Sequence, residues 1–117
     1  MKKTVLLSLF ALLLMGTGFP TDNLIATSLK ITIRNDLGNL ESGVTVTLYA
    51  NKEDFKKEDN SVRQGLTNEK GLVTFKNLQS KAYFVTAIKG DLNNYGLGVQ
   101  TNTLDAKKVN KVTIIIE

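Results

Sequence analysis

The sequence predicts an all-β domain, a seven-stranded antiparallel Greek-key sandwich. First, apolar and polar residues alternate with a period of two in several short segments, which is typical of strands with one buried face. Second, Gly, Asn and Asp, the residues that tight turns prefer, separate these segments. Third, 117 residues without cysteine are enough for one domain whose core needs no disulfides.

Seven segments carry the strand pattern. They cover residues 28–34, 44–50, 61–67, 73–76, 83–87, 95–103 and a last segment that begins at 109 or 111 and ends at 117. The stretch from Gly65 to Ala87 is the most regular, because strand, turn, strand, loop and strand follow one another within it. We expect Phe75 and Tyr83 in its core, with the tyrosine hydroxyl on a backbone partner, and a positive φ at Gly71.

Two of the expected strands have an unusual composition. Gly96 and Gly98 lie within segment 95–103 and indicate an edge, a bulge or a close backbone approach. The run Ile114–Ile116 is apolar on both faces of the last strand. Exposed, such a run would invite pairing with other chains, so we expect both of its faces to be covered.

Residues 51–60 form a charged insert between the second and third strands. Asn51 with Asp54 three residues later resembles a helix start, with aspartate in place of the usual Glu or Gln. The spacing predicts a short helical turn near residues 52–57, with Phe55 packed against the sandwich.

Residues 1–18 are typical of a secretory signal helix, with Lys2 and Lys3 before the apolar run 5–15. This run is too short to span a bilayer comfortably. Cleavage is expected before Phe19, with an alternative after Ser28. Residues 19–27 then form a linker and residues 28–117 the β-sandwich domain. The leader indicates export to the periplasm or the cell exterior, and the absence of cysteine removes lipid attachment.

A set of turn and core residues resembles a known family. The pattern is Asp36-x-Gly38, Gly43-Val44-x-Val46-x-Leu48, Thr67-Asn68-x-x-Gly71-x-x-x-Phe75-x-x-Leu78 and then Tyr83. It resembles the carboxypeptidase regulatory-like domain, a transthyretin-like (prealbumin-like) sandwich close to the Cna B-type repeats of surface proteins. Lys81 departs from this family, which usually has glycine there. The resemblance implies a non-catalytic accessory or stalk unit.

Related Cna B-type repeats often carry an intramolecular isopeptide bond between a lysine and an asparagine. The position that matches the lysine is Arg34, whose guanidinium stays protonated and is a poor nucleophile. The position that matches the helping acid is Ala87, and no asparagine follows the last strand before Glu117. We expect no such bond in this chain.

The composition argues against catalysis. The chain has neither histidine nor cysteine, which removes the commonest general bases, nucleophiles and transition-metal ligands. Hydroxyisourate hydrolases share the transthyretin-like fold, but that resemblance implies histidines and a C-terminal Tyr-Arg-Gly-Ser, both absent here. The acids Glu53, Asp54, Glu58 and Asp59 lie among lysines, as on a solvated surface. We expect no enzymatic activity and no cofactor.

The net charge of +4 does not indicate nucleic-acid binding. Lys2 and Lys3 belong to the leader, and without them 13 basic residues face 11 acidic ones. The remaining lysines are mixed with acids rather than gathered in a stripe, so we expect no nucleic-acid binding.

The loop of residues 89–96 is the candidate binding site, because it combines a glycine turn, two asparagines and an aromatic residue. Its candidate partner-binding residues are Asp91, Asn93, Asn94 and Tyr95. The first three could instead bind calcium, as could Asn35, Asp36 and Asn39, but neither set has EF-hand spacing and turn chemistry explains both.

The favoured function is a non-enzymatic envelope accessory or protein-interaction module. A small-ligand or polysaccharide binder using the same loop is the alternative. The expected partner is another envelope protein or a polysaccharide, with no transmembrane span remaining after the leader is cleaved.

Overall fold

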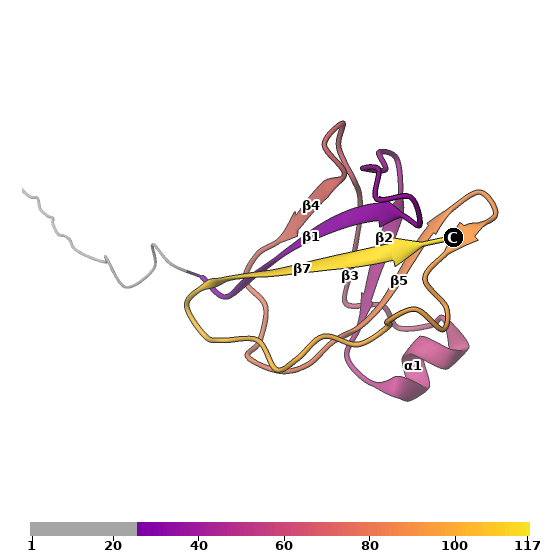
Figure 1. Ribbon diagram of the computed structural model, residues 1–117. Helices are drawn as coiled ribbons and strands as arrows, with labels where there is room; N and C mark the ends of the chain where they lie inside the picture. The colour runs from indigo at the N-terminus through magenta and orange to yellow at the C-terminus, as the bar shows by residue number, and fades with distance from the viewer. Residues whose placement is uncertain (1–25) are drawn as a thin grey trace, which may run out of the picture.

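The computed structural model describes residues 26–117 (Figure 1). The expected signal helix, the cleavage site before Phe19 and most of the linker lie outside these residues. The elements in chain order are β1 (Ser28–Asn35), β2 (Thr45–Tyr49), α1 (Lys52–Lys57), β3 (Arg63–Leu66), β4 (Leu72–Phe75), β5 (Phe84–Lys89), β6 (Leu92–Asn93) and β7 (Val109–Ile116). In the described part, no helix is long and apolar enough to cross a membrane.

The strands form two sheets that pack face to face. The first has the order β4-β1-β7 and the second the order β3-β2-β5-β6 (Figure 1). The all-β prediction is therefore confirmed in its broad form. The Greek-key order stays a prediction.

The core lies between the two sheets and consists of inward residues of β1, β2, β4, β5 and β7, together with Val44, Leu78, Tyr83 and Leu104 from the connecting segments. Its most buried large members are Leu29, Ile31, Ile33, Val44, Val46, Leu48, Val85 and Ile116. Phe75 and Tyr83 are 5% and 2% exposed, which confirms both as core residues. The Tyr83 hydroxyl accepts a hydrogen bond from the Gln79 backbone N–H at 3.0 Å, as expected for a buried tyrosine.

The prediction of a purely antiparallel sandwich is wrong for one pair of strands. β1 and β7 run parallel, from Ser28 opposite Val109 to Asn35 opposite Ile116, whereas β1–β4 and all pairs of the second sheet are antiparallel. A period-2 pattern reports which residues share a face and carries no information on strand direction. Parallel strands need a long connection, and here most of the domain lies between the two.

The sixth strand expected at 95–103 is also wrong. Within that range a single bridge joins Gln100 to Phe84, and the sixth strand is instead β6, before the range begins. Gly96 and Gly98 have φ values of +79° and +126°, which a continuous strand does not adopt. The glycines therefore mark a bent segment rather than a strand with a bulge.

The isoleucine run is covered only in part. Ile114 and Ile116 are buried in the core, whereas Ile115 is half-buried on the outer face. The expectation that both faces are covered is wrong at Ile115, because this face of the first sheet has no described element over it.

Two local predictions are confirmed. Asn51 caps α1, since its Oδ1 accepts from the Asp54 backbone N–H at 2.8 Å. Gly71 has φ +71°, and an added Cβ would lie 2.9 Å from the Ile33 carbonyl oxygen. A side chain at Gly71 is thus opposed by backbone conformation and by space.

Candidate functional site

The 89–96 loop is a tight turn followed by a bent segment. Lys89 pairs with Leu92 across a two-residue turn, and Gly90 at its first position has φ +59°. This is the position at which two-residue hairpins favour glycine. Asp91, at the tip, is exposed, so its carboxylate is free to meet a partner.

Asn94 has a structural role. Its side chain is fully buried, and Oδ1 accepts from the Ala87 N–H at 2.9 Å. Its Nδ2 donates to the carbonyl oxygens of Val85 at 2.9 Å and Gly98 at 3.0 Å. Asn94 therefore satisfies backbone groups beside β5, and its amide is turned away from any partner.

Asn93 and Tyr95 lie closer to the surface. Asn93 is half-buried, and its Oδ1 accepts from the Tyr95 N–H at 3.0 Å, while its backbone exchanges two hydrogen bonds with Glu117. Tyr95 is 44% exposed. Of the four candidate residues, Asp91 and Tyr95 thus present the most accessible side chains.

Tyr95 also joins the loop to the charged insert. Its ring centroid lies 6.3 Å from that of Phe55 in α1, and its hydroxyl donates to Glu58 Oε2 at 3.0 Å. Burial raises the pKa of Tyr95, and the hydrogen bond to Glu58 raises it further. Tyr95 and Glu58 are 37 positions apart in sequence, and their contact joins the loop and the insert into one surface.

An aromatic cluster underlies this surface on the outer face of the second sheet. Phe55 packs against Tyr49 at 6.0 Å edge-on and against Phe84 at 5.5 Å, both between ring centroids. Burial raises the pKa of Tyr49, with a smaller contribution from the charge of Glu58. The expected packing of Phe55 is confirmed, and it holds α1 on the sheet below the loop (Figure 1).

An ion pair ties the base of the loop to the first sheet. Lys89 Nζ lies 2.9 Å from Glu41 Oε1, and Asn35 Nδ2 donates to Glu41 Oε2 at 2.8 Å. The hydrogen bond from Lys89, followed by that from Asn35, lowers the pKa of Glu41. Since Asn35 ends β1 and Lys89 ends β5, Glu41 connects the two sheets at this end.

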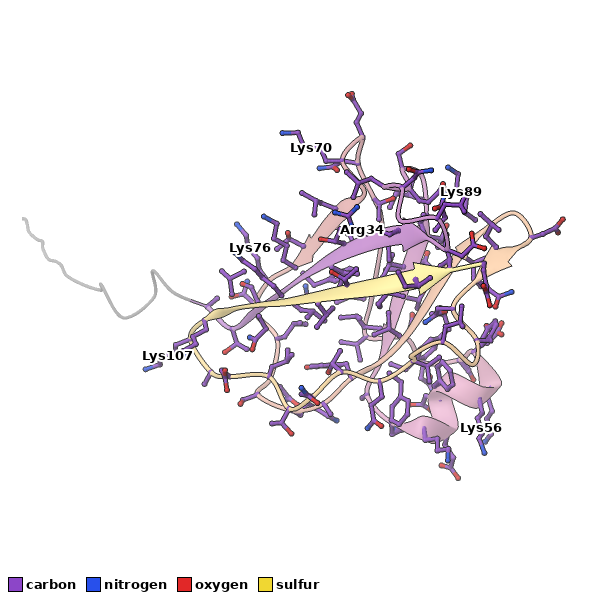
Figure 2. All side chains as sticks on the ribbon, viewed as in Figure 1. Arg34, Lys56, Lys70, Lys76, Lys89 and Lys107 are labelled. Atoms are coloured by element: carbon purple, nitrogen blue, oxygen red, sulfur yellow. The ribbon has the colours of Figure 1, made fainter. Side chains whose placement is uncertain are left out.

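The other candidate polar groups do not converge. Asn35 Oδ1 accepts from the N–H groups of Leu37 and Asn39, which is turn chemistry. Within residues 26–117, no group of three or more His, Cys, Asp or Glu residues is placed to hold a metal ion. The labelled cations Lys56, Lys70, Lys76 and Lys107 point out from different sides of the sandwich (Figure 2).

The positions that match the isopeptide family are placed as follows. Arg34 is half-buried, and its Nη1 donates to the Gly38 carbonyl oxygen at 2.7 Å. Ala87 is fully buried in the core, and Glu117 bonds to Asn93. The absence of an isopeptide bond stays a prediction, to be tested by intact mass.

Sequence reasoning missed the burial of Asn94 and the contact between Tyr95 and α1. Asn94 precedes Tyr95 and Gly96, a composition typical of an exposed turn. The Asn94 side chain is buried only because it packs against the backbone of β5. For Phe55 the sequence pattern indicated packing against the sandwich, but it did not indicate that the Tyr95 ring would be one of its partners.

The fold is similar to that of two bacterial pilins and of one further bacterial protein. A structure of the streptococcal ancillary pilin matches 93% of this chain and 36% of its own length, with a TM-score of 0.63 and 13% identity. The Bacillus anthracis TIE protein matches 92% of this chain and 18% of its own length, with a TM-score of 0.56 and 14% identity. BcpA, the major pilin subunit of Bacillus cereus, matches 80% of this chain and 30% of its own length, with a TM-score of 0.54 and 15% identity.

These similarities concern the fold. The chain spans between about a fifth and about a third of the length of the structures it matches. No protein-family profile matches the chain, and no curated protein matches its sequence. The two-sheet β-sandwich that the resemblance implies is confirmed, whereas the family itself, carboxypeptidase regulatory-like or Cna B-type, stays a prediction.

Proposed function

We propose that this protein is a non-enzymatic, exported β-sandwich module that acts at the cell envelope as a structural or protein-interaction unit. The observation that carries the proposal is the fold it shares with two pilins over 80% and 93% of its length. The lack of histidine and cysteine supports a non-catalytic role. The motif through Gly71, Phe75 and Tyr83 supports a carboxypeptidase regulatory-like assignment within this class.

We place the partner-binding surface at the 89–96 loop and the adjoining α1. Asp91 offers an exposed carboxylate at the tip of a tight turn. Tyr95 offers a half-exposed ring supported from below by Phe55. A rigid aromatic with a polar rim is typical of protein-binding surfaces. The expected partner is another envelope or pilus-like protein.

The direct test is a cross-linked pull-down from an envelope extract with the double variant Asp91→Ala/Tyr95→Ala. Asn94 stays unchanged, since its loss would disturb the fold. The matched control is Glu69→Ala/Lys70→Ala in the exposed β3–β4 turn. We expect the first variant to lose its partners and the control to keep them, with similar melting temperatures. Partners retained by both variants would place the site elsewhere.

Export is tested separately. The mature protein is expected in the periplasm or on the cell exterior without residues 1–18, and intact mass would show the cleavage point. Protein that remains in the cytosol and begins at Met1 would contradict the proposal.

A second candidate function is polysaccharide or small-ligand binding by the same loop, supported by the half-exposed ring of Tyr95. Stacking on a sugar face is a common use of such a ring. Titration with envelope oligosaccharides, followed by NMR, distinguishes the two functions. Binding that Tyr95→Ala abolishes would favour this candidate, and unchanged spectra would exclude it.

A further inference from the structure

The last strand, β7, has an open side. It is the end strand of the sheet β4-β1-β7, with β1 as its only full-length neighbour among residues 26–117 (Figure 1). On the β1 side, the Lys108 carbonyl oxygen accepts from the Ser28 N–H at 2.9 Å. On the opposite side, the Glu117 N–H and carbonyl bond to Asn93. β6 therefore covers only the final residue of this edge.

The directions of these bonds show which backbone groups of β7 are available. In a strand with a parallel neighbour, the N–H and C=O groups of alternate residues point to opposite sides. Lys108 points to β1 and Glu117 away from it, so Lys111, Thr113 and Ile115 also point away. No described residue bonds to the backbone groups of these three. They form a row of unpaired donors and acceptors.

A groove runs beside this row. Two hollows of about 220 and 540 Å³ lie between β7 and residues 97–105, and they adjoin each other, because Thr101, Asn102 and Val112 line both. The first has Val85, Leu97 and Ile114 among its apolar walls. The groove follows the open edge of β7 and has a mixed lining, with these apolar residues on one part and polar residues, Gln100, Thr101 and Asn102 among them, on the rest.

The opposite wall of the groove is held by β5. The Val85 N–H donates to the Val99 carbonyl oxygen at 2.8 Å, and the Thr101 N–H donates to the Tyr83 carbonyl oxygen at 2.9 Å. Residues 97–105 therefore bond along the second sheet rather than along β7. This arrangement keeps the two walls apart and leaves the β7 edge accessible.

The outer face beside the edge is basic. Lys30 and Lys111 are neighbours in the β1–β7 register, and the three strands of this sheet contain no acidic residue. At one end of the groove, Lys107 and Lys108 are exposed, and Asp105 lies 4.0 Å from Lys108. A strand added to this edge would place every second side chain on the outer face that carries Lys111.

We propose that the open edge of β7 binds an extended peptide segment of a partner protein, as an additional strand of the sheet. Its less polar side chains face the groove, and its acidic side chains lie on the outer face that carries Lys30 and Lys111. Main-chain hydrogen bonds supply affinity in this mode, and side chains at alternate positions supply specificity. A second copy of β7 would instead bring its own Lys107, Lys108 and Lys111 to a basic surface. The proposal does not depend on the 89–96 loop.

The probe is the blocked peptide Thr-Glu-Val-Glu-Val-Glu-Thr, which alternates acidic and less polar side chains. Its control is the same peptide with lysine at each glutamate position. Binding to the purified protein is followed by NMR shifts and by hydrogen exchange of the Lys111, Thr113 and Ile115 amides. We expect these amides to exchange quickly in the free protein and slowly with the acidic peptide, and the lysine peptide not to bind.

Two variants separate charge from backbone pairing. Lys111→Glu should weaken the acidic peptide by roughly tenfold or more and admit the lysine peptide, since like charges then face each other only in the former. The charge-matched control Lys70→Glu, in the distant β3–β4 turn, should change neither (Figure 2). Thr113→Pro removes one outward N–H and leaves the β1 ladder intact, so binding of the acidic peptide should be lost without a large change in melting temperature.

Three results would overturn the proposal. The first is no binding of the acidic peptide at millimolar concentration. The second is slow exchange of the three amides in the free monomer, which would mean that the chain covers its own edge. The third is dimerisation that Thr113→Pro abolishes, which would identify a second copy as the occupant.

Discussion

The two sheets of the sandwich differ in what covers them. The four-stranded sheet carries α1 and its aromatic cluster on the outer face, and its edges are β3 and the two-residue β6. The three-stranded sheet has no described element on its outer face, and one of its edges is the eight-residue β7. Short edges give another strand little to pair with, whereas a long one does. The three-stranded sheet therefore has one edge long enough to pair with a further strand. The four-stranded sheet has only short edges, and its outer face is covered by α1 and the aromatic cluster.

The largest expected effect concerns the core that both sheets share. Phe75→Ala should lower the free energy of unfolding by about 3–5 kcal/mol, because it empties a buried aromatic site. Thr74→Ala, on the bare outer face of the same strand, should cost far less. Urea melts of both variants measure the difference, and equal losses would mean that the outer face is not bare.

Asn94→Ala tests the side-chain hydrogen bonds that satisfy the open side of β5 in the second sheet. It leaves the Ala87 N–H and the Val85 and Gly98 carbonyls without their partner. We expect a loss of roughly 2–4 kcal/mol, since each unpaired buried backbone group costs about 1–3 kcal/mol.

Asn93→Ala is the matched control for this variant, because the Asn93 side chain holds only the Tyr95 N–H. It should cost below about 1 kcal/mol. A small effect of Asn94→Ala in the same denaturant melts would show that water replaces its hydrogen bonds.

Phe55→Ala tests the cover on the second sheet. It removes the contacts with Tyr49, Phe84 and Tyr95, but the site is only half-buried. The expected cost is roughly 1–2 kcal/mol, with loss of α1 helicity in circular dichroism. A cost as large as that of Phe75→Ala would place the helix within the cooperative core.

Glu41→Gln tests the link between the sheets and should have the smallest effect. The pKa of Glu41 is lowered from its usual 4.5 in the folded protein. Its contribution is therefore fully present above that value and is lost as the pH falls through the lowered folded pKa. We expect the variant to be less stable than the wild type at pH 7 and equally stable well below pH 4.

Glu69→Gln removes the same charge from an exposed turn and is the control for Glu41→Gln, which is expected to lose more stability at pH 7. The measurement is the free energy of unfolding in urea across the pH range. A difference that persists unchanged in acid would mean that the Glu41 carboxylate is not the cause.

The sequence by itself determined which residues of the regular strands face inward and where several of the turns lie. Alternation placed Leu29, Ile31 and Phe75 in the core, because side chains of a strand point to opposite faces in turn. Local chemistry placed the helix start at Asn51 and the positive φ at Gly71, because both depend on neighbours within a few residues.

Only the tertiary structure decided how these strands meet. Alternation is the same for parallel and antiparallel neighbours, so it could not show that β1 and β7 run parallel. Asn94 has the composition of a surface turn and is buried because β5 lies against it with unpaired groups. The open edge of β7 likewise arises because residues 97–105 bond to β5, a choice between two distant partners that no local pattern encodes.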